Sequence, residues 1–153
     1  MVNATTPVSL TAVEVELDFR FNAPRPRVWQ ALTQQTERWW PKDFCSKPDK
    51  TKAFRLELKL GGRLYEDWGD GNGCVWWTIY ELDAAGYAFA GLGYEGSAVQ
   101  TCVKFSLEEE AVSTVLKISD RIWGALPDNA VESHIQGWTW LFEDSFRAFV
   151  EKA

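Results

Sequence analysis

Residues 128–150 read DNAVESHIQGWTWLFEDSFRAFV, with an apolar residue at every third or fourth position. This spacing is typical of the buried face of an α-helix. Asp128 or Asn129 is suited to the N-cap, and Glu132 follows in the first turn, where a negative charge is favourable. The sequence therefore predicts a C-terminal helix of about 22 residues with an aromatic face. That face comprises Val131, Ile135, Trp138, Phe142, Phe146 and Phe149.

The segments before this helix have the patterns of strands. Residues 13–21, VEVELDFRF, alternate apolar and charged side chains, as a half-buried strand does. Six further segments have strand alternation or composition, and polar or glycine-containing turns separate them, which predicts an antiparallel meander. They are residues 54–60, 63–68, 74–82, 87–92, 99–107 and 112–120. Two short helices are expected at 25–33 and 36–40.

Composition limits the class of protein. The 153 residues are predicted to form one domain, with a flexible polar lead at residues 1–11. Hydrophobic residues make up 46% of the chain and charged residues 25%, which excludes a disordered chain. No apolar run approaches the roughly 20 residues of a membrane-spanning helix. The net charge of −6, without a dense basic stripe, argues against nucleic-acid binding.

The cysteines indicate a reducing compartment. Cys45, Cys74 and Cys102 are an odd number and form no CxxC pair, and the N-terminal residues lack the features of a secretion signal. We therefore expect a cytoplasmic protein with reduced thiols. The scattered cysteines and one histidine, His134, give no zinc-binding spacing, so neither a metal nor another cofactor is expected.

A glycine-rich segment, GLGYEG at residues 91–96, matches the pattern G-x-G-x-x-G of dinucleotide-binding loops. That motif needs a helix after the last glycine, because the N-terminus of the helix holds the pyrophosphate. Here residues 99–107 alternate as a strand. We therefore interpret the glycines as part of a connection between strands.

Aromatic residues are unusually frequent, with nine Trp, nine Phe and four Tyr making up 14% of the chain. So many rings in a small domain favour an apolar cavity or a contact surface. The surplus of rings is also compatible with a homodimer.

Two carboxylates, Glu66 and Asp120, fall on the apolar faces of their predicted strands. A carboxylate among apolar side chains must find a hydrogen-bond partner or take up a proton. It is therefore either in a structural pair, with Arg63, Arg121 or Tyr65 as partner, or it orients a ligand or transfers a proton. Glu66→Gln is expected to change stability by no more than about 1–2 kcal/mol.

His134 lies beside the apolar stripe of the predicted C-terminal helix. It is either a surface or hydrogen-bonded histidine on the flank of that helix, or a polar group at the edge of a cavity. In the second case it is a candidate general acid or base, because imidazole suits proton transfer near neutral pH.

Four segments carry a family resemblance that spans most of the chain. They are PRVWQALT at 26–33, RWWP at 38–41, GGRLYE at 61–66 and Gly137-Trp138 followed by Leu141. They resemble motifs of the START-like superfamily (SRPBCC), in the branch related to the activator of heat-shock-protein ATPase. The resemblance implies an α+β helix-grip fold, in which a curved antiparallel sheet of about seven strands wraps around a long C-terminal helix. It also implies a hydrophobic cavity under that helix.

We expect this cavity to bind a small hydrophobic molecule. One alternative is an enzyme of the polyketide cyclase or dehydratase kind, with Glu66, Asp120 and His134 as catalytic candidates. Another is a module that binds a chaperone, for which the acidic character of residues 54–153 is the support. The residues expected to contact the ligand are Trp39, Trp40, Tyr65, Glu66, Trp68, Trp77, Trp138 and Phe142.

Overall fold

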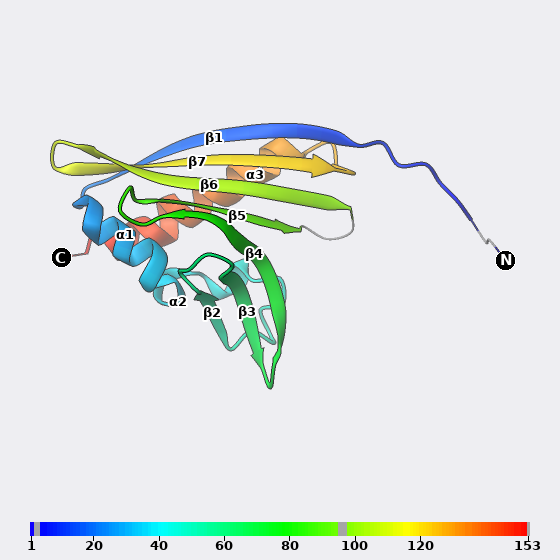
Figure 1. Ribbon diagram of the computed structural model, residues 1–153, viewed down its shortest axis with the longest axis horizontal. Helices are drawn as coiled ribbons and strands as arrows, with labels where there is room; N and C mark the ends of the chain where they lie inside the picture. Colours follow the sequence, from blue (N-terminus) through cyan, green and yellow to red (C-terminus); the bar gives the residue numbers. More distant parts are fainter. Residues whose placement is uncertain (2–3, 95–97, 153) are drawn as a thin grey trace.

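The computed structural model describes residues 1, 4–94 and 98–152. Seven antiparallel strands form one curved sheet with the order β1-β7-β6-β5-β4-β3-β2 (Figure 1). The strands from β2 to β7 therefore follow one another as a meander, and β1 closes the other edge against β7. Their bounds are β1 (Thr11–Phe21), β2 (Ala53–Leu56), β3 (Arg63–Gly69), β4 (Asn72–Asp83), β5 (Ala88–Tyr94), β6 (Val99–Glu110) and β7 (Ser113–Gly124).

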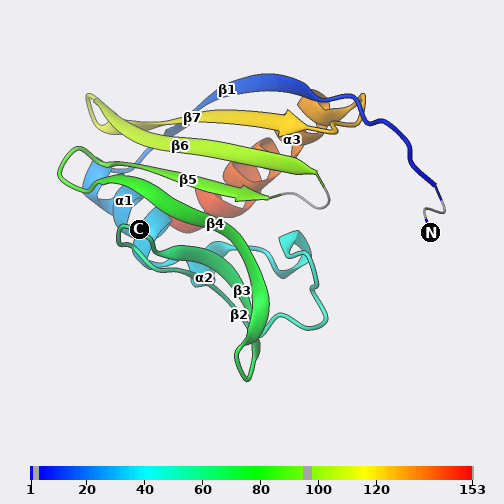
Figure 2. The ribbon, with the colours of Figure 1, turned by 45° about the vertical axis from the view of Figure 1, so that its right-hand side comes forward.

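The helices pack on one face of this sheet, and the sheet bends around them toward β2 and β3 (Figure 2). Two short helices and a 3₁₀ turn connect β1 to β2, and a helical segment without a break follows β7. The elements are α1 (Arg25–Gln34), α2 (Thr36–Trp39), η1 (Lys42–Phe44), α3 (Ala130–Thr139), the π-helical η2 (Trp140–Phe146) and α4 (Arg147–Val150). This arrangement confirms the predicted helix-grip fold.

The core between the two layers consists largely of aromatic rings. Trp39 of α2 packs against Phe142 and Phe146 of η2, with ring centroids 5.9 and 4.7 Å apart. Phe89 of β5 stacks on Phe105 of β6 at 4.9 Å. Phe105 in turn contacts Phe142 of η2 at 6.4 Å between ring centroids, so rings on the sheet and rings on the helices bury one another.

The first two turns of the C-terminal helix do not bury the predicted stripe. Val131 and Ile135 are 39% and 38% exposed, whereas Ala130 and Trp138 are buried. Each residue of an α-helix turns the chain by about 100°, so Ala130 lies on the face adjacent to Val131. The predicted stripe was wrong at Val131 and Ile135 because the helix turns the adjacent face toward the sheet.

The second half of the helix does follow the predicted stripe. Phe142 and Phe146 are fully buried, and Phe149 packs against the core at its edge. The hydrogen bonds of η2 span five residues rather than four, so its turns are wider. A spacing of four residues, from Phe142 to Phe146 and then to Val150, therefore remains on the buried face.

Strand β2 ends at Leu56, earlier than the predicted strand 54–60. Leu60 is 70% exposed, and Gly61 has a φ of +78°, which favours glycine. The Gly61 N–H donates to the Ile79 carbonyl. A turn that packs against β4 therefore takes the place of the end of the predicted strand. The predicted alternation was correct at Phe54 and Leu56, and after Leu56 the turn replaces the strand.

The glycines of GLGYEG make room for a tryptophan. A Cβ built at Gly91 would lie 2.9 Å from the Cβ of Trp77, and one at Gly93 would lie 2.8 Å from Trp77 Cδ1. The Trp77 indole therefore lies directly over the backbone of β5, which any larger residue would prevent. Residues 95 and 96 of the motif lie outside the described residues.

Gly93→Ala is accordingly expected to destabilise the protein by about 1–3 kcal/mol, the usual effect of overpacking a core. Its new methyl group would approach the backbone carbonyl oxygen of Trp76 to 1.8 Å, so β4 and β5 would have to separate. Urea denaturation measures the change. A variant with an unchanged midpoint would contradict the close approach of these two strands.

Candidate functional site

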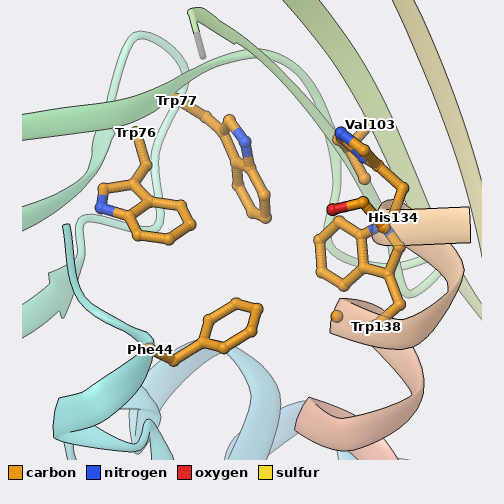
Figure 3. A pocket seen from close by; sticks show the side chains of 8 residues that line it. Phe44, Trp76, Trp77, Val103, His134 and Trp138 are labelled. Carbon is orange, nitrogen blue, oxygen red and sulfur yellow. The ribbon is translucent and has the colours of Figure 1, made fainter. Parts of the chain in front are cut away.

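A pocket of about 270 Å³ lies between β4, β6 and α3, with η1 on its remaining side. Its walls are mostly aromatic, and its polar groups lie on α3 (Figure 3). The lining residues are Phe44, Trp76, Trp77, Val103, Ser133, His134, Gly137 and Trp138. This is a concave apolar site with a polar edge, the usual character of a small-molecule site.

Two adjacent tryptophans of β4 line the same pocket, although neighbours in a regular strand point to opposite faces. The pairing of β3 with β4 shifts here: Leu64 pairs with Trp77, but Tyr65 pairs with Val75. Trp76 is therefore the extra residue of a β-bulge, which redirects its side chain. The bulge is the reason that β4 contributes two indole rings to the pocket.

The polar edge of the pocket is supported by a buried carboxylate. Asp120 on β7 is 1% exposed, and its Oδ2 accepts a hydrogen bond of 2.8 Å from the Trp138 indole N–H. The same oxygen lies 2.8 Å from His134 Nδ1. Asp120 thus joins two residues of the pocket wall, Trp138 and His134, to the sheet. Arg121, one of the partners considered for the two carboxylates, instead pairs with Glu14 on the exposed face.

Glu66 on β3 lies behind the pocket wall. It is fully buried and accepts hydrogen bonds from the Ser46 and Lys47 N–H groups, from Thr51 Oγ1 and from the indoles of Trp76 and Trp68. Burial raises the pKa of this carboxyl, but the hydrogen bonds outweigh the burial and lower the pKa from 4.5 to about 2. Glu66 is therefore an ionised anchor for the loop that carries Phe44 and for the Trp76 ring.

The predicted ligand contacts fall into three groups. Trp77 and Trp138 line the pocket, and Glu66 supports it from behind. Trp39, Trp40 and Phe142 lie in the core, where they border a void of about 20 Å³, room for about one water molecule. The other two lie outside the pocket lining: Tyr65 borders a groove on the opposite face of β3, and Trp68 lies beneath the ammonium groups of two loop lysines.

The sequence interpretation missed five lining residues: Phe44, Trp76, Val103, Ser133 and Gly137. The doublet Trp76-Trp77 opposite two glycines of β5 was a usable signal, because only a bulged and close-packed strand pair accommodates it. Phe44 gave no signal, since its position depends on the hydrogen bonds of the loop to Glu66.

Two further findings concern the described part of the chain. Within it, no cluster of three or more His, Cys, Asp or Glu side chains could hold a metal ion. None of its helices has both the length and the apolar character needed to cross a membrane.

No protein-family model and no curated protein sequence matches the chain. Solved structures do. A protein of Rhizobium leguminosarum has a TM-score of 0.68 at 18% identity, covering 97% of this chain and all of its own. Ara h 8.0201 has a TM-score of 0.65 at 16% identity, covering 92% of this chain and 98% of its own.

A third match is DynU16, a protein of the dynemicin biosynthetic locus, with a TM-score of 0.65 at 18% identity. The alignment covers 91% of this chain and 47% of DynU16. At such low identity these likenesses show a shared fold and not a shared activity. The chain therefore shares the helix-grip fold of these proteins.

Proposed function

We propose that the protein binds a small, planar, hydrophobic molecule in the pocket between β4 and α3. The observation that carries this proposal is the aromatic wall formed by Phe44, Trp76, Trp77 and Trp138. Aromatic rings offer large, flat contact areas and bind other rings by stacking or edge-on contact. The surrounding structure holds these rings in place, so binding costs little side-chain conformational entropy.

The size and polarity of the pocket narrow the class of ligand. Its volume of about 270 Å³ lies just below the range of roughly 300–1,000 Å³ common for drug-sized ligands, which favours a molecule of two rings. Ser133 and His134 form the polar edge. We therefore expect one polar substituent, such as a hydroxyl or carbonyl group, at one end of the ligand. The place of DynU16 in a biosynthetic locus favours a product or intermediate of small-molecule biosynthesis.

Gly137 offers the sharpest test of this proposal. A Cβ at this position would point toward the Phe44 ring at 3.5 Å, an ordinary contact, so larger side chains project into the pocket. Gly137→Leu is expected to weaken binding of 2-naphthol, a planar two-ring alcohol, at least about tenfold, which corresponds to 1.4 kcal/mol. Isothermal titration calorimetry measures the affinity.

The matched control is Gly137→Ala, which adds one methyl group. It is expected to gain about 0.5–1 kcal/mol of stability from helix propensity and to keep most of the affinity. If 2-naphthol binds Gly137→Leu as tightly as the wild type, the ligand site lies elsewhere. If 2-naphthol does not bind the wild type, the proposed ligand class is wrong.

The finer predictions from the sequence stay predictions. They are the relation to the activator of heat-shock-protein ATPase, a chaperone partner, a homodimer and a cytoplasmic location. The matched structures share only the fold, and a fold alone does not decide among functions.

A further inference from the structure

The aromatic rings that line the pocket are arranged as a cage. Phe44 comes from η1, Trp76 and Trp77 from β4 and Trp138 from α3, and Figure 3 shows the four rings around one space. The ring centroids of Trp77 and Trp138 lie 5.9 Å apart, and those of Phe44 and Trp76 lie 6.1 Å apart. A molecule in the pocket therefore meets rings from three different elements. The face of an aromatic ring is electrically negative and attracts a cation within about 6 Å of its centroid.

Two of these rings donate to buried carboxylates. The Trp76 indole N–H donates to Glu66 Oε2 at 2.6 Å, and the Trp138 indole N–H donates to Asp120 Oδ2 at 2.8 Å. Glu66 is fully buried and Asp120 is 1% exposed, so solvent screens these groups little. A hydrogen bond to a carboxylate also polarises the indole, which makes the ring more attractive to a cation. The pocket thus has a carboxylate behind two of its aromatic walls.

The chain supplies neither Lys nor Arg to the described lining of this pocket. Among those lining residues the titratable side chain is His134, and its imidazole lies against Asp120. Even a protonated His134 would leave the two carboxylates, Asp120 and Glu66, with an excess of negative charge. The loop lysines lie over a different ring, that of Trp68. The net charge of −6 also favours the approach of a cation over that of an anion.

We propose that the ligand of this pocket is an organic cation whose positive charge lies on a ring nitrogen or a quaternary nitrogen. This proposal rests on the proposed function and names the charge of its ligand. Such a nitrogen is held by aromatic rings and needs no hydrogen-bond acceptor. A primary ammonium group would instead need acceptors for three N–H bonds, and Ser133 and His134 are the polar side chains in the described lining. The cage therefore suits a cation whose charge is surrounded by carbon atoms.

Two probes of equal size separate the effect of charge from that of shape. 2-Methylisoquinolinium is a planar two-ring cation. 3-Methylisoquinoline has the same number of non-hydrogen atoms and is uncharged at pH 8. We expect the wild type to bind the cation at least about tenfold more tightly, although the loss of hydration on burial opposes binding of the cation. Isothermal titration calorimetry at pH 8 measures both dissociation constants.

Asp120→Asn and Glu66→Gln test the contribution of the two carboxylates. Each substitution nearly keeps the shape of the side chain and removes its charge, so the preference for the cation should fall about threefold or more. The preference is the ratio of the two dissociation constants, and a loosened pocket would weaken both probes without changing this ratio. The matched control, Asp18→Asn, removes an exposed carboxylate from β1 and should keep the wild-type ratio. If Asp120→Asn fails to fold, Glu66→Gln decides.

The possible results separate this proposal from the proposed function. If the wild type binds the cation no more tightly than 3-methylisoquinoline, the cation cage is wrong and the ligand site stands. Binding of 2-naphthol without binding of the cation would have the same meaning. An unchanged ratio in both carboxylate variants would overturn the role of Glu66 and Asp120. If the wild type binds none of the three probes, both proposals are wrong.

Discussion

Trp138→Ala is expected to lower the free energy of unfolding by about 3–5 kcal/mol, as large-to-small core substitutions of aromatic residues do. The Trp138 ring lies within 6 Å, centroid to centroid, of the rings of Trp77, Phe105 and Phe142. Its removal would leave a cavity among them and would take one hydrogen bond from the buried Asp120. The variant should also lose 2-naphthol binding, because Trp138 is one of the ring walls of the pocket. Urea denaturation and calorimetry measure the two effects.

Trp140→Ala is the matched control, because it removes the same side chain two residues further along the helix. Trp140 is 39% exposed, and its ring centroid lies 5.2 Å from that of Phe44. We therefore expect the free energy of unfolding to fall by no more than about 1 kcal/mol. An equal decrease in the free energy of unfolding in the two variants would contradict the placement of Trp138 between sheet and helix.

Glu66→Gln is expected to destabilise the protein by about 2–4 kcal/mol, more than the sequence interpretation allowed. Both carboxylate oxygens accept hydrogen bonds: Oε2 from Ser46 N–H and Trp76, Oε1 from Lys47 N–H and Thr51. An amide group places an N–H₂ donor against two of these donors in either orientation. The loop that carries Phe44 should loosen, so 2-naphthol binding should weaken as well. Glu16→Gln, on the exposed side of β1, should change stability by less than about 0.5 kcal/mol.

The effect of Glu66 should also depend on pH in a definite direction. Its pKa is about 2 in the folded protein against 4.5 ordinarily, so the unfolded chain takes up its proton first as pH falls. The stability that Glu66 contributes is complete above about pH 4.5 and is lost between pH 4.5 and pH 2. The difference in unfolding free energy between wild type and Glu66→Gln should therefore narrow across this window. A constant difference from pH 6 to pH 2 would show that Glu66 does not titrate as the hydrogen bonds require.

The fold was predictable because its signals are local. Alternation marks the strands, and short turns allow only antiparallel neighbours, so the order of β2 to β7 follows directly from the chain. The existence of the C-terminal helix was predictable, but the face that it turns toward the sheet was not. Its apolar residues cover more than one face, and packing against the sheet buries Ala130 while it leaves Val131 and Ile135 partly exposed.

The site was less predictable because it depends on contacts between distant segments. Glu66 and Asp120 were correctly placed on inward faces, but their partners come from the loop after α2 and from α3. Arg63, Arg121 or Tyr65 was the structural partner considered for these carboxylates, and instead backbone N–H groups and indole rings satisfy Glu66. A β-bulge at Trp76 also cannot be deduced from a regular period of two, although the Trp doublet at residues 76 and 77 indicates one in retrospect.

The most direct test of the ligand site uses the indole N–H signals of the nine tryptophans in a two-dimensional ¹H–¹⁵N NMR spectrum. Titration with 2-naphthol is expected to shift the signals of Trp76, Trp77 and Trp138, which line the pocket. The signals of Trp29 and Trp123, which are not among its lining residues, should stay in place. Shifts at Trp29 or Trp123 without shifts at Trp77 and Trp138 would contradict the proposed site.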